Sequence, residues 1–175
     1  FERLCVKLTR QGAHHPLQGK DDQTSKEFIA SLESSVNLYQ GAFLEGFSLP
    51  TLAEFEEWVA QQRYALERLY LLALGELIEY ASEQGKSELA ILYAQRYLDT
   101  DPLAEDIHRR LIELYAVTGN RNAAVRQFEI CAHMLDQELG VSPLPETRAA
   151  YQDALEKRIS LKWAEKPTWK SAPGV

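Results

Sequence analysis

Basic residues are scarce in this chain, which has 19 Lys and Arg against 26 Asp and Glu and a formal net charge of −7. Nucleic-acid-binding domains usually carry a basic face, because neutralising phosphates supplies much of their affinity. The composition therefore argues against a domain that binds DNA or RNA through its overall charge. Cysteine is also scarce, since only Cys5 and Cys131 occur. We therefore expect no disulfide framework and a reducing, cytoplasmic environment.

Several other patterns are missing as well. No apolar run approaches the ~20 residues that cross a bilayer, and no segment alternates at the period of two that is typical of a half-buried strand. The start, Phe1-Glu2-Arg3-Leu4, is neither a signal peptide nor an initiator Met, so we expect the chain to begin inside a longer protein. A glycine-rich phosphate loop and a G-x-S-x-G motif are absent too. The sequence therefore predicts no catalytic residues, no cofactor and no enzyme activity.

What the sequence does contain is a repeat. Gly85 and Gly119 are 34 residues apart, and the residues around them recur in step. The matching pairs are Leu74 with His108, Leu77 with Leu111, Ile78 with Ile112, and Ala90 with Ala124. A period of about 34 residues with Gly between two helical patterns is typical of the tetratricopeptide helix–turn–helix. Such units stack around a shared core and leave a curved helical surface for a partner.

Apolar spacing and end signals predict about seven helices in an all-α, tetratricopeptide-like array of antiparallel helix pairs. The predicted helices are Phe1–Leu8, Thr24 or Ser25 to Gln40, Thr51 to just before Gly85, Ser87–Thr100, Ala104–Thr118, Arg121–Leu139, and Glu146 to near Ser160 with Pro145 at the first position. Residues 1–160 form the predicted domain, and 161–175 read as a flexible tail or linker.

Three local expectations follow from these assignments. Thr51-Leu52-Ala53-Glu54 has the pattern of a capping box at the start of the long helix. Gly75 lies inside that helix, where we expect it to let a neighbouring helix approach closely. The loop 41–50 is unusually apolar and is expected to pack onto the body of the domain.

Motifs along most of the chain resemble one family. Three stretches carry the likeness. The first two are Leu38-Tyr39-Gln40-Gly41-Ala42-Phe43-Leu44 and Trp58–Arg63 with Leu66 and Leu69. The third and most specific is Glu138-Leu139-Gly140-Val141-Ser142-Pro143, followed by Pro145-Glu146-Thr147-Arg148. The chain resembles the bacterial transcriptional activator domain of antibiotic-regulatory-protein-type transcription factors from Phe1 to Tyr151. One departure is Leu144, where the family commonly has a Ser as helix cap; losing that hydroxyl costs on the order of 1 kcal/mol.

The resemblance implies a protein-interaction and activation domain. In such regulators an N-terminal winged-helix domain binds promoter DNA, and the helical domain packs on it and supports dimerisation or recruitment of RNA polymerase. The expected partners are therefore the protein's own winged-helix domain, a second protomer and RNA polymerase. DNA contact is expected only through the winged-helix domain, and no membrane contact is expected. An alternative keeps the fold but makes it a ligand-sensing module of a signalling ATPase, with Phe43, Phe47 and Trp58 lining an apolar pocket.

The histidines and cysteines predict no metal site. His14 and His15 have no third ligand nearby in the sequence and are taken as solvated loop residues. His108 falls at a repeat position that is usually packed. Cys131 is expected to be a buried, inert thiol between helices.

The repeat register suggests a polar groove, because the first helix of each stacked pair lines the concave side. The candidate partner-binding residues are Glu79, Glu83, Arg109, Arg110 and Glu113. An ordinary solvated helix face explains the same charges and is the preferred interpretation, because charge alone rarely specifies a site. The basic residues near the end (Lys157, Arg158, Lys162, Lys166 and Lys170) fit a soluble linker better than a set of DNA phosphate contacts.

Overall fold

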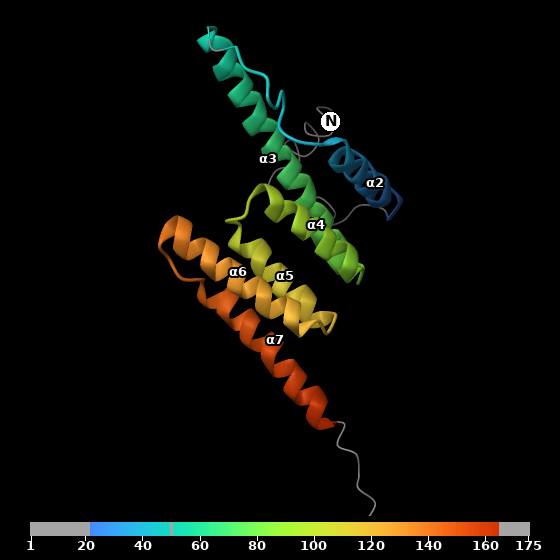
Figure 1. The fold of residues 1–175 in the computed structure, drawn as a ribbon. Coiled ribbons are helices and arrows are strands. Elements are labelled where there is room, and N and C mark those ends of the chain that lie inside the picture. The colour runs from blue at the N-terminus through green and yellow to red at the C-terminus, as the bar shows by residue number, and fades with distance from the viewer. Residues whose placement is uncertain (1–21, 50, 165–175) are drawn as a thin grey trace, which may run out of the picture. The chain divides into compact units, whose positions relative to one another are not determined.

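The computed structural model describes residues 22–49 and 51–164, with side chains at 26–49 and 51–156. These residues form six α-helices and contain no β-strand (Figure 1). The helices are α2 (Asp22–Leu38), α3 (Ala53–Glu83), α4 (Ser87–Thr100), α5 (Glu105–Val117), α6 (Arg121–Leu139) and α7 (Pro145–Ala164). The all-α fold class is confirmed. The first predicted helix, Phe1–Leu8, lies outside the described residues.

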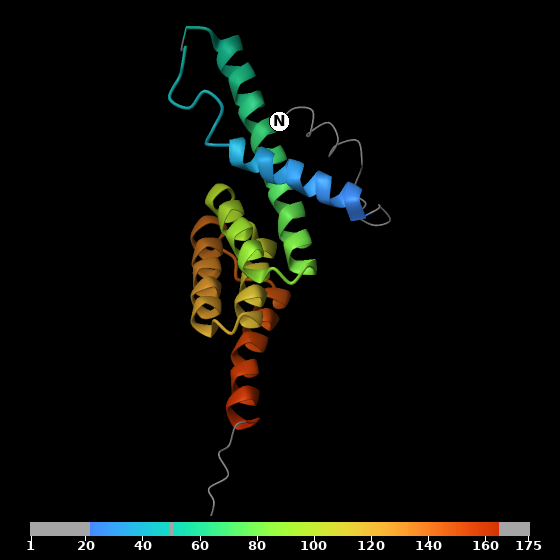
Figure 2. The ribbon, with the colours of Figure 1, turned by 90° about the vertical axis from the view of Figure 1, so that its right-hand side faces the viewer.

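The chain divides into two compact units, the first ending at Thr100 and the second beginning at Asp101. In the first unit α3 packs against both α2 and α4. In the second unit α5, α6 and α7 pack against one another, and the C-terminal half of α7 continues beyond its two neighbours (Figures 1 and 2). The two predicted repeats are therefore the hairpins α3–α4 and α5–α6, one in each unit.

The two hairpin turns have the same hydrogen-bond pattern. At the first, Lys86 N–H donates to the Ala81 carbonyl at 2.8 Å and Gly85 N–H to the Ser82 carbonyl at 3.0 Å. At the second, Asn120 N–H donates to the Tyr115 carbonyl at 2.8 Å and Gly119 N–H to the Ala116 carbonyl at 3.2 Å. Gly85 has φ 67° and Gly119 φ 74°, the left-handed conformation that a Schellman turn requires at this position. The 34-residue repeat is thus present in the backbone.

The repeated apolar positions are buried in both hairpins. All eight residues of the four matched pairs, from Leu74 with His108 to Ala90 with Ala124, are buried. In the second unit Ile112, Ala124 and Ala154 form one core cluster, beside which the ring of Phe128 stacks on Tyr151 at 4.2 Å. Helix α7 therefore completes the core of the α5–α6 hairpin.

Polar contacts tie α2 to α4 in the first unit. Arg96 on α4 donates to the Val36 carbonyl at 2.9 Å and to the side chain of Asn37 at 3.2 Å. The hydroxyl of Tyr93 donates to the carboxylate of Glu33 at 3.1 Å. Burial, with a further contribution from the Glu33 charge, raises the pKa of Tyr93 to about 12. These contacts hold α2 in place beside the α3–α4 hairpin.

The predicted starts of two helices are wrong. Helix α3 begins at Ala53 after Leu52, and no side chain among the described residues caps this end, so the capping box at Thr51 does not form. Glu56 turns back instead and accepts hydrogen bonds from the Ser48 hydroxyl, at 2.9 Å, and from the Leu49 N–H. Helix α2 already begins at Asp22, which places Thr24 and Ser25 inside the helix.

Two further expectations differ from the structure. Apart from the backbone of its own helix, no described atom lies within 4 Å of the point where a Cβ on Gly75 would sit, so the expected close approach is wrong. Helix α7 ends at Ala164, past the predicted end near Ser160. The predicted domain boundary at residue 160 stays a prediction. The other predicted ends agree within two residues for α4, α5 and α6.

Candidate functional site

The five predicted groove residues belong to two helices in different units. Glu79 and Glu83 lie one turn apart on α3, and both are exposed. Arg109, Arg110 and Glu113 lie on α5, and all three are half-buried. The structure therefore places two acidic side chains on one surface of the first unit and a mixed set on the second.

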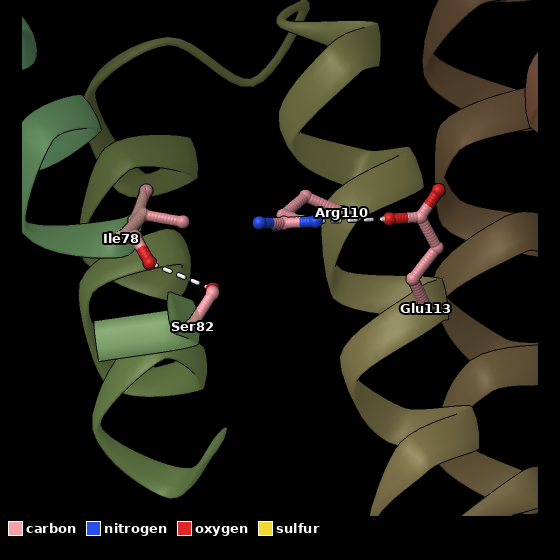
Figure 3. Close-up of polar contacts among 4 residues, drawn as sticks. All are labelled: Ile78, Ser82, Arg110 and Glu113. Carbon is pink, nitrogen blue, oxygen red and sulfur yellow. Dashed lines mark hydrogen bonds and ion pairs between the residues drawn. The ribbon is translucent and has the colours of Figure 1, made fainter. Parts of the chain in front are cut away.

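Within α5 the structure brings Arg110 and Glu113 together. The Arg110 Nη1 atom lies 3.4 Å from Glu113 Oε2, as Figure 3 shows. Figure 3 also shows a separate contact within α3, where the Ser82 hydroxyl donates to the Ile78 carbonyl at 2.7 Å. Half-exposed ion pairs one turn apart contribute only about 0.5 kcal/mol. The Arg110–Glu113 pair is thus a weak contact between two partly exposed side chains.

Helix α5 also positions His108, which is buried as the repeat predicts. The His108 ring lies between two polar groups of the second unit, with Nε2 3.0 Å from the Pro102 carbonyl and Nδ1 2.6 Å from the Gln127 side-chain nitrogen. Burial lowers the pKa of His108, against the raising effect of the Pro102 carbonyl and nearby carboxylates. The packing role expected for His108 is confirmed.

Cys131 is a free, fully buried thiol, as predicted. Burial raises the pKa of Cys131 to about 11, with a smaller contribution from Glu105. Burial of this kind disfavours the thiolate, which is the nucleophilic and metal-binding form of cysteine. In the part of the chain that the structure describes, no group of three or more His, Cys, Asp and Glu is placed to hold a metal ion. His14, His15 and Cys5 lie outside that part.

An exposed apolar feature is formed by the loop after α2 and the first turns of α3. We call it the aromatic surface, and it consists of Phe43, Leu44, Phe47, Leu52, Phe55 and Trp58. Phe47 packs edge-to-face on Phe55 with ring centroids 6.0 Å apart, and Phe43 packs likewise on Trp58 at 5.9 Å. The Phe55 and Trp58 rings are 6.0 Å apart and join the two pairs. The rings thus form one continuous set.

The prediction that this loop packs onto the body of the domain is correct only in part. The loop rings do contact α3, yet Phe47 is 48% exposed and Trp58 47%. The sequence shows an apolar loop but does not show which side of each ring faces water. Phe47 and Trp58 are therefore exposed at the surface, and Phe43 is half-buried beside them.

None of the six described helices combines the length and apolar character that a bilayer-spanning segment needs. The predicted linker residues 165–175 and the side chains of Lys157, Arg158 and Lys162 lie outside the described set.

Comparison with known proteins finds a matching family and two similar relatives. The family described as "Bacterial transcriptional activator domain" matches residues 3–155. Two curated relatives, both named "Transcriptional regulatory protein MoaR1", come from Mycobacterium tuberculosis and Mycobacterium bovis. Each is 27% identical over 121 residues, which is 68% of this chain and 39% of the relative. The chain thus spans about two fifths of the relatives' length. No solved structure matches.

Proposed function

We propose that this chain, which belongs to the family of bacterial transcriptional activator domains, supports transcription by binding other proteins and leaves DNA recognition to a separate domain. The family match over residues 3–155 is the observation that carries the proposal, because it takes in nearly every described helix. The MoaR1 proteins are much longer than the matched region, which leaves room for other domains. The proposed setting is the cytoplasm, where bacterial transcription takes place.

Three protein partners are proposed. They are a winged-helix DNA-binding domain in the same polypeptide, a second protomer, and RNA polymerase. The net charge of −7 supports this division of labour, because an acidic domain is repelled by DNA phosphates and attracted to basic protein surfaces.

The predicted groove residues are proposed as partner contacts, with one set on each unit. Glu79 and Glu83 present two accessible carboxylates on α3, and α5 presents Arg109 beside the Arg110–Glu113 pair. Rim charges of this kind act mainly on association rate and partner choice. We therefore expect charge reversal at Glu79 and Glu83 to weaken partner binding modestly, while the helical fold is unchanged.

A tethering experiment tests the proposed function. The chain is fused to an unrelated DNA-binding domain whose operator lies upstream of a weak promoter. Transcription from that promoter should rise several-fold over the DNA-binding domain alone. A helical domain without an interaction role, fused in the same way, is the control. Failure to raise transcription at any operator spacing would refute an activation role.

A second experiment tests the division of labour. The unfused chain should show no salt-sensitive binding to duplex DNA in a gel-shift titration, because its net charge of −7 opposes contact with phosphates. Tight binding that weakens steeply between low and physiological salt would contradict the proposal.

A further inference from the structure

We infer that the aromatic surface is a docking site for an α-helix of another protein, one whose apolar stripe is flanked by Lys or Arg. Single exposed apolar residues are ordinary on protein surfaces. Four aromatic rings in mutual contact, with Phe47 and Trp58 each about half-exposed, are a continuous apolar feature. Aromatic clusters of this kind supply most of the binding energy at protein interfaces.

The rings are held in place before any partner binds. Arg63 on α3 donates hydrogen bonds of 2.7 Å to the backbone carbonyls of both Phe43 and Leu44. Glu56 fixes the other end of the loop through Ser48 and Leu49. A surface that is already ordered loses less conformational entropy when a partner binds.

The backbone at Leu44 supports the same inference. Leu44 has φ 51°, which makes it the one non-glycine residue with positive φ among the described residues. This left-handed conformation costs a leucine side chain some free energy, and such strain persists only where surrounding contacts enforce it. The Leu44 carbonyl accepts hydrogen bonds from Arg63 at 2.7 Å and from the Phe47 N–H at 3.0 Å, and these contacts hold the residue in place.

The surrounding charges select the partner. No Lys, Arg or His occurs between Lys26 and Arg63. The side chains of Glu45, Glu54 and Glu57 are exposed on the loop and on the first turns of α3, beside the rings. Arg63 is already committed to the loop carbonyls. The rim is therefore acidic, and it attracts a partner whose apolar residues are flanked by basic ones.

The ring spacing fits a helix. Neighbouring ring centroids are 5.9 to 6.0 Å apart. Side chains one turn apart on a helix are separated by about 5–6 Å, so successive apolar residues of a helix can lie against successive rings. Recognition of an amphipathic helix by an apolar surface is a recurrent mode of protein binding. The inference deepens the proposed function and rests on it, because it assigns the site for a protein partner.

Two designed peptides test the inference. Both are amphipathic helices with the same leucine stripe, flanked by lysines in one and by glutamates in the other. Each is labelled and titrated with the 175-residue chain, and binding is followed by fluorescence anisotropy. The lysine peptide should bind with a micromolar Kd, and the glutamate peptide about tenfold more weakly or worse. Equal binding of the two, or no binding of the lysine peptide even at about 1 mM, would overturn the inference.

Variants locate the binding. Trp58→Ala should raise the Kd of the lysine peptide about tenfold or more, because the substitution removes the ring that joins the two aromatic pairs. Leu92→Ala is the matched control: Leu92 is 50% exposed on α4 of the same unit, outside the aromatic surface, and its loss should leave the Kd unchanged. The double variant Glu54→Lys with Glu57→Lys should reverse the preference toward the glutamate peptide. Circular dichroism confirms that each variant is folded. Retained binding by Trp58→Ala would contradict the site.

The two proposals fail in different ways. The peptide titration requires no transcription, so its failure removes the docking site and leaves the tethering result standing. If the tethered chain does not activate while the lysine peptide still binds at Trp58, the proposed function fails and the surface is kept.

Discussion

Gln127 and His108 meet inside the second unit, where the Gln127 side-chain nitrogen lies 2.6 Å from His108 Nδ1. The other ring nitrogen lies 3.0 Å from the Pro102 carbonyl. A neutral ring with its proton on Nε2 satisfies both contacts, because Nε2–H donates to the carbonyl and Nδ1 accepts from the amide; this tautomer is assigned from its partners. A second proton, on Nδ1, would face the Gln127 amide donor. The geometry thus agrees with the lowered pKa of His108.

Stability should therefore fall on acidification. Because the folded pKa of His108 lies below its unfolded value of 6.5, the unfolded chain binds more protons as the pH drops through that value. The free energy of unfolding should decrease below about pH 6.5 and level off below the folded pKa. Urea unfolding followed by circular dichroism between about pH 8 and 5 measures this slope.

Two variants assign the slope to the buried histidine. His108→Phe keeps an aromatic ring at the repeat position and should flatten the pH dependence, although losing the polar contacts lowers stability at pH 8. The exposed His133, replaced by Gln, is the matched control and should retain the slope. An unchanged slope in His108→Phe would show that other groups govern the acid response.

Two glycine substitutions should have effects of opposite sign. Gly75→Ala should stabilise by up to about 1 kcal/mol, because Ala favours a helix interior and space is open at that site. Gly119→Ala should destabilise by about 1–2 kcal/mol, because φ 74° is strained for alanine even though space is open there too. Thermal or urea unfolding measures both. Destabilisation by Gly75→Ala would indicate a neighbour at that position.

The sequence predicted the repeat well because its signals are local. Gly85 and Gly119 end their helices through residues five positions away or fewer, and the apolar period follows from one helix face. Asn120 caps α6 through the Ala123 N–H, again within one turn. Where the deciding contact lies within a turn, residue order is enough to fix the helix end.

The predictions that failed depend on contacts made through the fold. At the start of α3, Glu56 reaches back and accepts a hydrogen bond from Ser48. The capping pattern at Thr51 does not indicate this contact. Arg96 contacts Val36 across 60 residues, and no local pattern indicates such a pairing. The exposed rings were missed for a similar reason, because an apolar loop is equally consistent with a buried or a half-exposed arrangement.

The loop after α2 should depend on Arg63. Arg63→Ala removes both hydrogen bonds to the Phe43 and Leu44 carbonyls, so the loop should open more often. Limited proteolysis with chymotrypsin detects this, because the loop contains Phe43 and Phe47, and cleavage there should become several-fold faster. Arg68→Ala, at an exposed position on the same helix, is the control. Equal cleavage rates in the two variants would mean that the aromatic contacts and the Glu56 hydrogen bonds hold the loop without Arg63.

Cys131 should resist alkylation while the protein is folded. Its thiol is fully buried on α6, and burial raises its pKa to about 11, so at pH 8 almost none of it is thiolate. Iodoacetamide should therefore modify Cys131 only after urea unfolds the second unit, with peptide-resolved mass spectrometry separating it from Cys5. Cys131→Ala should lower the free energy of unfolding by about 1 kcal/mol through lost packing alone. Rapid alkylation of Cys131 in the folded chain would show that α6 opens locally, because the thiol is reached only when the helix moves away from its neighbours.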